Sequence, residues 1–373
     1  MNTERPNLLV FMCDQLQAAA VRGSDVATPN FDRLASRGVR FTHAYAPNPV
    51  CSPSRASFMT GLLPHNHGVR WVTHTVARDQ GLLREEHRHW AQDLQDSGYR
   101  TMYFGKWHVE HTEDPSRFGW DLDYSLHSKR YRDAAREAAV SDGTDCLGSI
   151  RGYVSEPSGY KQRLLYGSST KQPEKRHLGF LTSLALQEME GIKGPWCCFV
   201  STPEPHDPFV CSDSSLEDVD IDSLELPTTL YDDLSGRPKM YAKSRRAFDD
   251  LSERQHREAR ACYYASVREL DTELGRLLSF LEKTDQLDET IVVLTSDHGE
   301  SLGDHGTYFK NVSASESIFG IPMIIAGPGV DRRGDCAARV SLHDLAQTLR
   351  ELSGNEANDV PDSRSFLRLL RSS

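Results

Sequence analysis

Five short, continuous runs of apolar residues constrain the fold of this chain more than any other feature. They occupy residues 8–12, 101–104, 196–200, 291–294 and 322–325. An apolar run of this length without alternation is typical of a parallel strand that is buried on both faces of a sheet. Segments of helical periodicity, such as residues 90–97 and 257–282, lie between the runs. We therefore predict an α/β fold with a mostly parallel central sheet and helices on both faces.

Two segments interrupt this alternation. Residues 127–176 are rich in Ser, Gly, Lys and Arg with scattered Tyr, and residues 211–252 are acidic at first and contain Pro227, Gly236 and Pro238. We interpret both as long loops near the mouth of a site, with solvated connectors as the alternative interpretation. A chain of 373 residues has enough length for one large domain, and we predict a single domain over residues 1–373.

The overall charge and the cysteines limit the environment in which the protein works. The formal net charge of −11 argues against binding to nucleic acid or to an anionic membrane, because it repels phosphates. The first six residues are polar, and the apolar run that follows is too short for a signal core or a membrane span. The eight cysteines form no paired framework, and Cys197 and Cys198 are adjacent. These features predict reduced thiols and a cytoplasmic location.

Polar clusters follow four of the apolar runs. Asp14-Gln15 follows the first run, the cluster at residues 105–108 the second, the cluster at 202–209 the third, and the cluster at 295–306 the fourth, with Lys310 shortly after. Taken singly, each cluster fits a turn, a helix cap or a structural histidine. In an open α/β sheet, however, all four would converge at the carboxyl edge, which is where such sheets bind ligands.

The sequence Cys51-Ser52-Pro53-Ser54-Arg55 opens a segment with helical periodicity. A thiol at a helix N-terminus beside a guanidinium has a lowered pKa and is reactive. The alternative is a buried structural cysteine, with Pro53 merely opening the helix. Together with the four clusters, this Cys-x-Pro-Ser-Arg motif resembles type I sulfatases of the alkaline-phosphatase superfamily. Asp-Gln at residues 14–15 is similar to cytoplasmic members that resemble choline sulfatases and phosphonate monoester hydrolases.

The resemblance implies a modified nucleophile and a metal. Cys51 would be oxidised by a formylglycine-generating enzyme to formylglycine, whose hydrated aldehyde attacks sulfur and later expels sulfate. The implied ligands of one divalent cation are Asp14, Gln15, Cys51, Asp297 and His298. Ca²⁺ is the expected ion because oxygen ligands suit it, and Mn²⁺ and Mg²⁺ remain open.

The resemblance also implies roles for further catalytic side chains. Lys106, Lys310 and Arg55 would neutralise the charge of the ester. His206 and Lys310 would bind the ester and protonate the leaving oxygen, and His108 would be the base that takes a proton from the second hydroxyl. The substrate would be a small-molecule or carbohydrate sulfate ester.

The chain departs from the family pattern in two places. Residues 70–74 replace a segment in which many relatives carry a substrate-binding Asn, and we expect Trp71 or His74 to shape the pocket instead. Relatives usually continue into a smaller antiparallel subdomain at the C-terminus, which we expect to be reduced or absent here. The open alternatives are a phosphonate monoester or phosphodiester hydrolase using the same site, and a non-catalytic binding protein. Assembly into a homo-oligomer is also left open.

Overall fold

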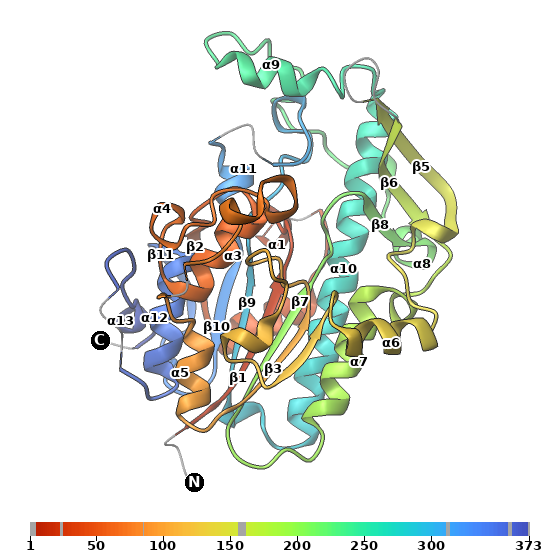
Figure 1. Ribbon diagram of the computed structural model, residues 1–373. Helices are drawn as coiled ribbons and strands as arrows, with labels where there is room; N and C mark the ends of the chain where they lie inside the picture. Colours follow the sequence, from red (N-terminus) through yellow and green to blue (C-terminus); the bar gives the residue numbers. More distant parts are fainter. Residues whose placement is uncertain are drawn as a thin grey trace.

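The computed structural model describes residues 5–22, 25–84, 86–155, 162–310, 314–356 and 360–371. Its central feature is an eight-stranded sheet with the strand order β11-β2-β10-β9-β1-β7-β3-β4 (Figure 1). The strands of this sheet are β1 (Asn7–Cys13), β2 (Gly38–Tyr45), β3 (Arg100–Gly105), β4 (Leu122–Ser125), β7 (Trp196–Thr202), β9 (Thr290–Ser296), β10 (Met323–Ala326) and β11 (Gly334–Ser341).

Strand β1 lies in the middle of the sheet and explains why the first apolar run is unbroken. It pairs in parallel with β7 on one side and with β9 on the other. Leu9 and Phe11 belong to the hydrophobic cluster on one face of the sheet, whereas Leu8 and Val10 belong to the cluster on the opposite face. Both faces therefore require apolar side chains, as predicted for a buried parallel strand.

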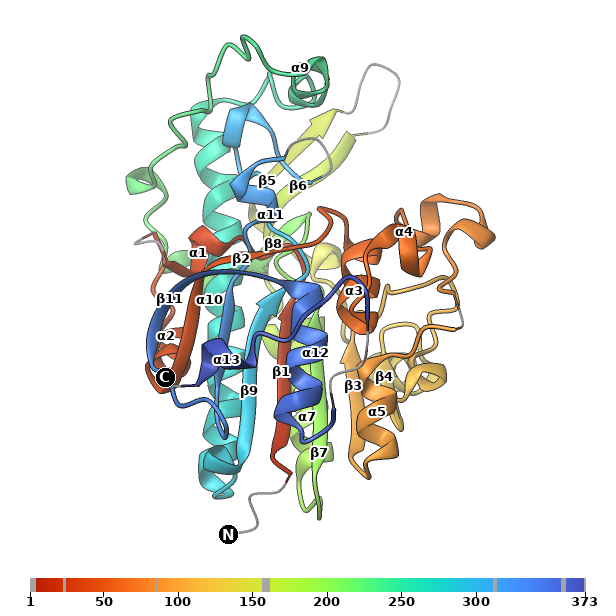
Figure 2. The ribbon, with the colours of Figure 1, turned by 90° about the vertical axis from the view of Figure 1, so that its left-hand side faces the viewer.

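Helices cover both faces of the sheet, which confirms the predicted fold class. The helices that contribute to one apolar cluster are α2 (Pro29–Arg37), α7 (His177–Met189) and α10 (Glu253–Lys283). Those that contribute to the other are α3 (Cys51–Thr60), α5 (Trp90–Asp96) and α12 (Leu342–Leu352). Figure 2 shows α12 in front of the sheet and α10 behind it.

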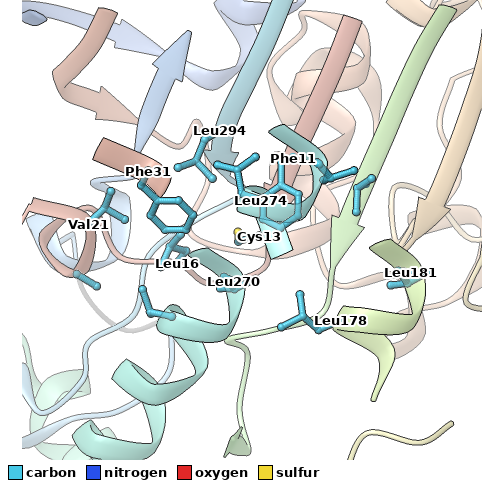
Figure 3. Packing of buried hydrophobic residues seen from close by; sticks show 14 of the residues in the cluster. Phe11, Cys13, Leu16, Val21, Phe31, Leu178, Leu181, Leu270, Leu274 and Leu294 are labelled. Atoms are coloured by element: carbon cyan, nitrogen blue, oxygen red, sulfur yellow. The ribbon is translucent and has the colours of Figure 1, made fainter. Parts of the chain in front are cut away.

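The long helix α10 illustrates how local sequence and packing act together. Ser252 Oγ accepts a hydrogen bond from the backbone N–H of Gln255, and the side-chain oxygen of Gln255 accepts one from the backbone N–H of Ser252, which fixes the helix start. Leu270 and Leu274 then face Phe11 and Phe31 across the core (Figure 3). Within the described part of the chain, no helix combines the length and apolar character that a membrane span requires.

The direction of β10 differs from the prediction. The apolar run at residues 322–325 predicted another parallel strand, but β10 runs antiparallel to both of its neighbours, β9 and β2. All four residues of β10 are buried. A continuous apolar run reports that both faces of a strand are buried, and it carries no information about the direction of the strand.

The interpretation of residues 127–176 as a long loop is wrong. This segment contains α6 (Lys129–Glu137) and the strands β5 (Leu147–Ser155) and β6 (Gln162–Ser169). With β8 (Phe209–Ser212), β5 and β6 form a second, three-stranded sheet in the order β5-β6-β8. Its Ser- and Gly-rich strands lack the apolar runs of the central sheet, so their pattern did not reveal them.

Residues 211–252 include the end of β8 and two further helices, so they are not one loop either. The remaining helices are short and lie outside the two main layers; they are α1 (Ala18–Arg22), α4 (Pro64–His67), α8 (Asp213–Glu217), α9 (Lys239–Arg245), α11 (Glu316–Phe319) and α13 (Leu367–Leu370). After β11, the described residues form α12 and α13.

Candidate active site

The carboxyl ends of four adjacent strands bring the predicted clusters together. Strands β9, β1, β7 and β3 are neighbours and run in parallel. Asp297 follows β9, Asp14 follows β1 and Lys106 follows β3. At the end of β3, Gly105 has a φ of 101°, and a Cβ at this position would lie 2.0 Å from the carbonyl oxygen of Ser201. Glycine therefore allows the backbone to approach β7 closely and to present Lys106 at the sheet edge.

Cys51 is the first residue of α3, a helix in which every residue is buried. Its Sγ lies 3.0 Å from Lys310 Nζ, 3.2 Å from His298 Nε2 and 3.8 Å from Lys106 Nζ. Burial opposes ionisation of the Cys51 thiol, but Lys106, Lys310 and His298 outweigh it and hold its pKa well below the ordinary value. The sequence predicted a lowered pKa for Cys51 and assigned it to the neighbouring guanidinium, whereas in the structure Lys106, Lys310 and His298 are the main causes.

Cys51 also belongs to a compact group of ligand atoms with Asp14, Asp297 and His298, all within 4.8 Å of one another. The Nδ1–H of His298 donates to the Gly299 carbonyl at 2.9 Å. Its Nε2 is therefore free to face Asp14 Oδ1, 3.5 Å away. Two carboxylates and an imidazole nitrogen aimed at one point form a donor set that fits a divalent cation.

Asp14 keeps its negative charge in this buried position. Burial and the neighbouring Cys51 both raise the pKa of Asp14, but the positive charges of Lys106 and Lys310 more than compensate, so its pKa lies below the usual range. Lys106 Nζ forms an ion pair with Asp14 Oδ2. The side chain of Gln15 lies beside this group, and its Oε1 accepts a hydrogen bond from Lys310 Nζ at 2.8 Å.

Arg55 lies behind the carboxylates. Its Nε donates to Asp297 Oδ2 at 2.7 Å, its Nη1 donates to Ser201 Oγ at 2.8 Å, and its Nη2 is 3.8 Å from Asp14 Oδ2. Arg55 is 1% exposed and does not line the cavity described below. Its guanidinium therefore contacts the two carboxylates of the candidate metal site, and it does not reach the cavity.

His206 and Lys310 form a directed pair. The Nδ1–H of His206 donates to the backbone carbonyl of Asp207 at 2.7 Å, so His206 Nε2 is the atom that accepts from Lys310 Nζ at 2.6 Å. Burial, aided by the charge of Lys310, lowers the pKa of His206 to about 4. Conversely, burial lowers the pKa of Lys310, but Cys51 and Asp14 raise it above its ordinary value. The proton between the two side chains thus resides on Lys310.

A cavity of about 560 Å³ opens beside these groups. Its walls combine apolar side chains with six histidines. His74, Lys106, His108 and His206 line it on the nucleophile side, and His127, Asp142, Thr144 and Arg176 line it from the segment 127–176. No residue of the segment 211–252 is among the walls. Residues of the segment 127–176 therefore lie at the cavity, although this segment forms a helix and two strands instead of the predicted loop.

The two residues predicted to shape the pocket lie in different environments. His74 lines the cavity, and its Nδ1 is 3.2 Å from Nε2 of His108, with the rings stacked. Trp71 is 60% exposed and is not part of the cavity wall. Burial, with the charge of Lys106, lowers the pKa of His108 to about 4, so this imidazole is neutral near pH 7.

Some polar residues at the site received no role from the sequence. Asp207 and Glu300 lie within the predicted clusters and both accept hydrogen bonds from Gln15 Nε2. Arg163, which forms an ion pair with Asp207, comes from β6, far from any cluster. Asp207 and Glu300 could have been proposed as site residues because they lie in polar clusters that follow strands. Nothing in the sequence around Arg163 indicates that it belongs to the site.

Comparisons with known proteins agree with this geometry. A sequence profile described as Sulfatase matches residues 6–355 of the chain. A choline-sulfatase from Rhizobium meliloti is 28% identical over 385 residues, which cover 96% of this chain and 70% of that protein. An N-acetylglucosamine-6-O-sulfatase from Bacteroides thetaiotaomicron is 26% identical, covering 95% of this chain and 69% of that protein.

A solved structure shares the same architecture. The phosphonate monoester hydrolase from Silicibacter pomeroyi superposes with a TM-score of 0.78 at 25% identity, covering 98% of this chain and 76% of that one. The similarity extends over the central sheet, its helices and the strand ends that carry the polar clusters, because nearly the whole chain is aligned.

Proposed function

The chain belongs to the sulfatase family and is a sulfuric ester hydrolase, and we propose that it acts through an aldehyde nucleophile made from Cys51 beside one divalent cation. The observation that carries this proposal is the convergence of two lysines on one sulfur atom. Lys310 Nζ and Lys106 Nζ lie 3.0 and 3.8 Å from Cys51 Sγ. A sulfate ester is an anion, and a nucleophile that attacks it works best where fixed positive charge surrounds the reacting group.

The modified residue and the cation would supply chemistry that the unmodified side chains lack. Cys51 Sγ lies where the oxygens of a hydrated formylglycine would lie, and that group offers one hydroxyl for attack and a second for the later release of sulfate. A divalent cation held by Asp14, Gln15, Asp297 and His298 would neutralise sulfate oxygens and favour the ionised nucleophile. We propose Ca²⁺, with Mn²⁺ and Mg²⁺ as alternatives.

The chain's own residues can perform the proton transfers that such a reaction requires. Lys310, which donates to Nε2 of His206, can deliver a proton to the oxygen of the leaving alcohol. His108 is neutral and can therefore accept a proton from the hydroxyl that remains at residue 51. Lys106 holds a fixed positive charge at the same place.

Arg55 has a different role from these side chains in our proposal. It is buried against Asp297 and Asp14 and contacts no cavity. Asp297 raises the pKa of Arg55 against the effect of burial, so its charge is permanent. We therefore propose that Arg55 positions the two carboxylates that bind the metal.

The cavity sets the size of the substrate. A volume of about 560 Å³ suits a small alcohol or a sugar unit beside the sulfate group. We propose a small-molecule or carbohydrate sulfate ester, and formylglycine-generating enzyme as the partner during maturation. The likeness to a phosphonate monoester hydrolase over 98% of the chain favours phosphonate monoester or phosphodiester hydrolysis as the second candidate.

The first experiment measures the nucleophile directly. The protein is produced together with a formylglycine-generating enzyme, and the peptide that contains Cys51 is analysed by mass spectrometry. We expect a mass loss of about 18 Da, because the thiol becomes an aldehyde, with hydrolysis of an aryl sulfate rising in proportion to conversion. Cys336→Ala, which changes a cysteine on the edge strand β11, is the matched control and should keep full activity, whereas Cys51→Ala should have none.

Two outcomes would redirect the proposal. Turnover of a phenylphosphonate ester at a higher kcat/KM than the aryl sulfate would favour the second candidate. Complete conversion of Cys51 without turnover of either ester, while a divalent cation is bound, would point to a binding protein that has lost catalysis.

A further inference from the structure

The amide of Gln15 is held by a set of hydrogen bonds that leaves only one orientation. Its Nε2 lies 3.1 Å from Asp207 Oδ1 and 2.5 Å from Glu300 Oε2. Its Oε1 accepts from Lys310 Nζ at 2.8 Å. Both protons of the amide nitrogen point at carboxylates, so the carbonyl oxygen must face Lys310, whose Nζ also lies 3.0 Å from Cys51 Sγ in the ligand group.

The two carboxylates are themselves fixed from behind. Glu300 is fully buried, and its Oε1 accepts from the backbone N–H groups of Leu302 at 3.0 Å and Phe309 at 2.6 Å. Its Oε2 is thereby left for Gln15. Asp207 forms an ion pair through Oδ2 with Arg163, a residue of the second sheet, which leaves Oδ1 for Gln15.

The backbone of Gln15 is equally constrained. Its φ is 68°, its N–H donates to Asp297 Oδ1 at 3.1 Å, and its carbonyl accepts from Tyr263 Oη at 2.8 Å. The side chain therefore cannot turn away from Asp207 and Glu300 without losing several buried hydrogen bonds. Leaving such groups without partners is costly in a buried site.

From this arrangement we infer that Asp207 and Glu300 are positioning residues that require an amide at residue 15 and aim its oxygen at the metal. This inference rests on the proposed function, because it assumes that a cation binds at the group of Asp14 and Asp297. It explains why residue 15 is a glutamine. A carboxylate at residue 15 would face the carboxylates of Asp207 and Glu300 and would have no N–H to donate to either of them.

The expected effect of Gln15→Glu on metal affinity is the opposite of what its added negative charge alone would produce. Hard cations bind carboxylates well, so an added carboxylate should by itself tighten binding. We expect instead that Gln15→Glu, which replaces one nitrogen by oxygen at constant size, weakens binding of Mn²⁺ by roughly 10- to 100-fold, the usual cost of disturbing a group that orients a ligand. Glu300→Gln should weaken binding similarly, because its new amide nitrogen would face the nitrogen of Gln15.

The double variant Gln15→Glu/Glu300→Gln tests the pairing itself. Residue 300 can now donate from Nε2 to the carboxylate at residue 15, while its Oε1 still accepts from Leu302 and Phe309. Asp207 still faces a carboxylate in this variant, so we expect it to recover part of the lost affinity and to bind more tightly than the product of two independent losses would allow. The measurement is a calorimetric titration of the full-length, chelator-stripped protein with Mn²⁺, with far-UV circular dichroism as the check on folding.

A matched control separates positioning from general damage. Asp271 is a buried carboxylate on α10 that accepts from Asn30 and from the N–H of Phe31. Asp271→Asn should lower the temperature of unfolding without changing Mn²⁺ affinity. If Gln15→Glu does not fold, the double variant must fold for the inference to stand.

The outcomes distinguish this inference from the function on which it rests. Unchanged or tighter binding by Gln15→Glu, or a double variant no better than the product of the single losses, would overturn the inference while leaving the metal site intact. A parent protein that binds no Mn²⁺, Ca²⁺ or Mg²⁺ would refute the metal site, and the inference with it.

Discussion

The two ends of the active site are built on different principles. At the nucleophile end, Asp14, Cys51, Asp297 and His298 are buried, and neighbouring lysines and Arg55 balance their charges. At the cavity end, apolar walls alternate with histidines, and His108 carries no charge near pH 7. The first end is built for fixed charge, whereas the second is suited to recognising a substrate and moving protons. Substitutions at the first end should therefore cost far more than substitutions at the second.

The largest effect should come from removing fixed charge beside the nucleophile. We expect Lys106→Ala to lower kcat by roughly 10²- to 10³-fold, the usual cost of losing one preorganised charge that stabilises a transition state. Steady-state kinetics with an aryl sulfate measure it. Lys129→Ala on α6, where the side chain is 86% exposed, is the control and should leave kcat unchanged. A rise in KM alone would mean that Lys106 acts only in binding the ground state.

A buried histidine near the cavity should make stability depend on pH. His89 is fully buried, and its ring stacks against both Trp107 and Phe118. Burial, with the charge of Arg350, lowers its pKa from the ordinary 6.5 to about 3. As the pH falls below 6.5, His89 therefore takes up a proton in the unfolded chain but stays neutral in the folded chain.

Stability from His89 should thus be present above pH 6.5 and lost progressively down to about pH 3. The free energy of unfolding should fall by up to about 1.4 kcal/mol per pH unit for this one proton. His89→Phe should remove this part of the slope in urea denaturation of the metal-free protein at pH 7, 6 and 5. If the free energy of unfolding depends on pH equally in both proteins, His89 takes up its proton equally in the folded and unfolded states, which would contradict this prediction.

The smallest effect tests the cavity end directly. His74→Ala removes a hydrogen bond to His108, and we expect kcat to fall by roughly two- to tenfold, the value of one such bond. Trp71→Ala should change kcat and KM by less than about twofold, as for most exposed positions. An equal loss of kcat in both variants would indicate that Trp71 contacts the substrate and would contradict its position outside the cavity wall.

The sequence by itself determined five strands of the central sheet and the clusters that form the nucleophile end of the site. An unbroken run such as residues 8–12 reports burial on both faces, and polar residues directly after such runs must meet at one edge when the strands are parallel. The resemblance carried by these clusters and the cysteine motif implied Asp14, Cys51, Asp297 and His298 as metal ligands, and the structure brings these four side chains together.

Only the tertiary structure decided the direction of β10, the second sheet and the partners of the site residues. Apolar patterning is the same for either strand direction, so the antiparallel pairing of β10 could not be read from it. Arg163 reaches Asp207, and Arg55 turns toward Asp297, through contacts between segments far apart in the chain. Residue order records which side chains are near a strand end, but hydrogen-bond partners such as those of Gln15 depend on how separate strands and loops come together.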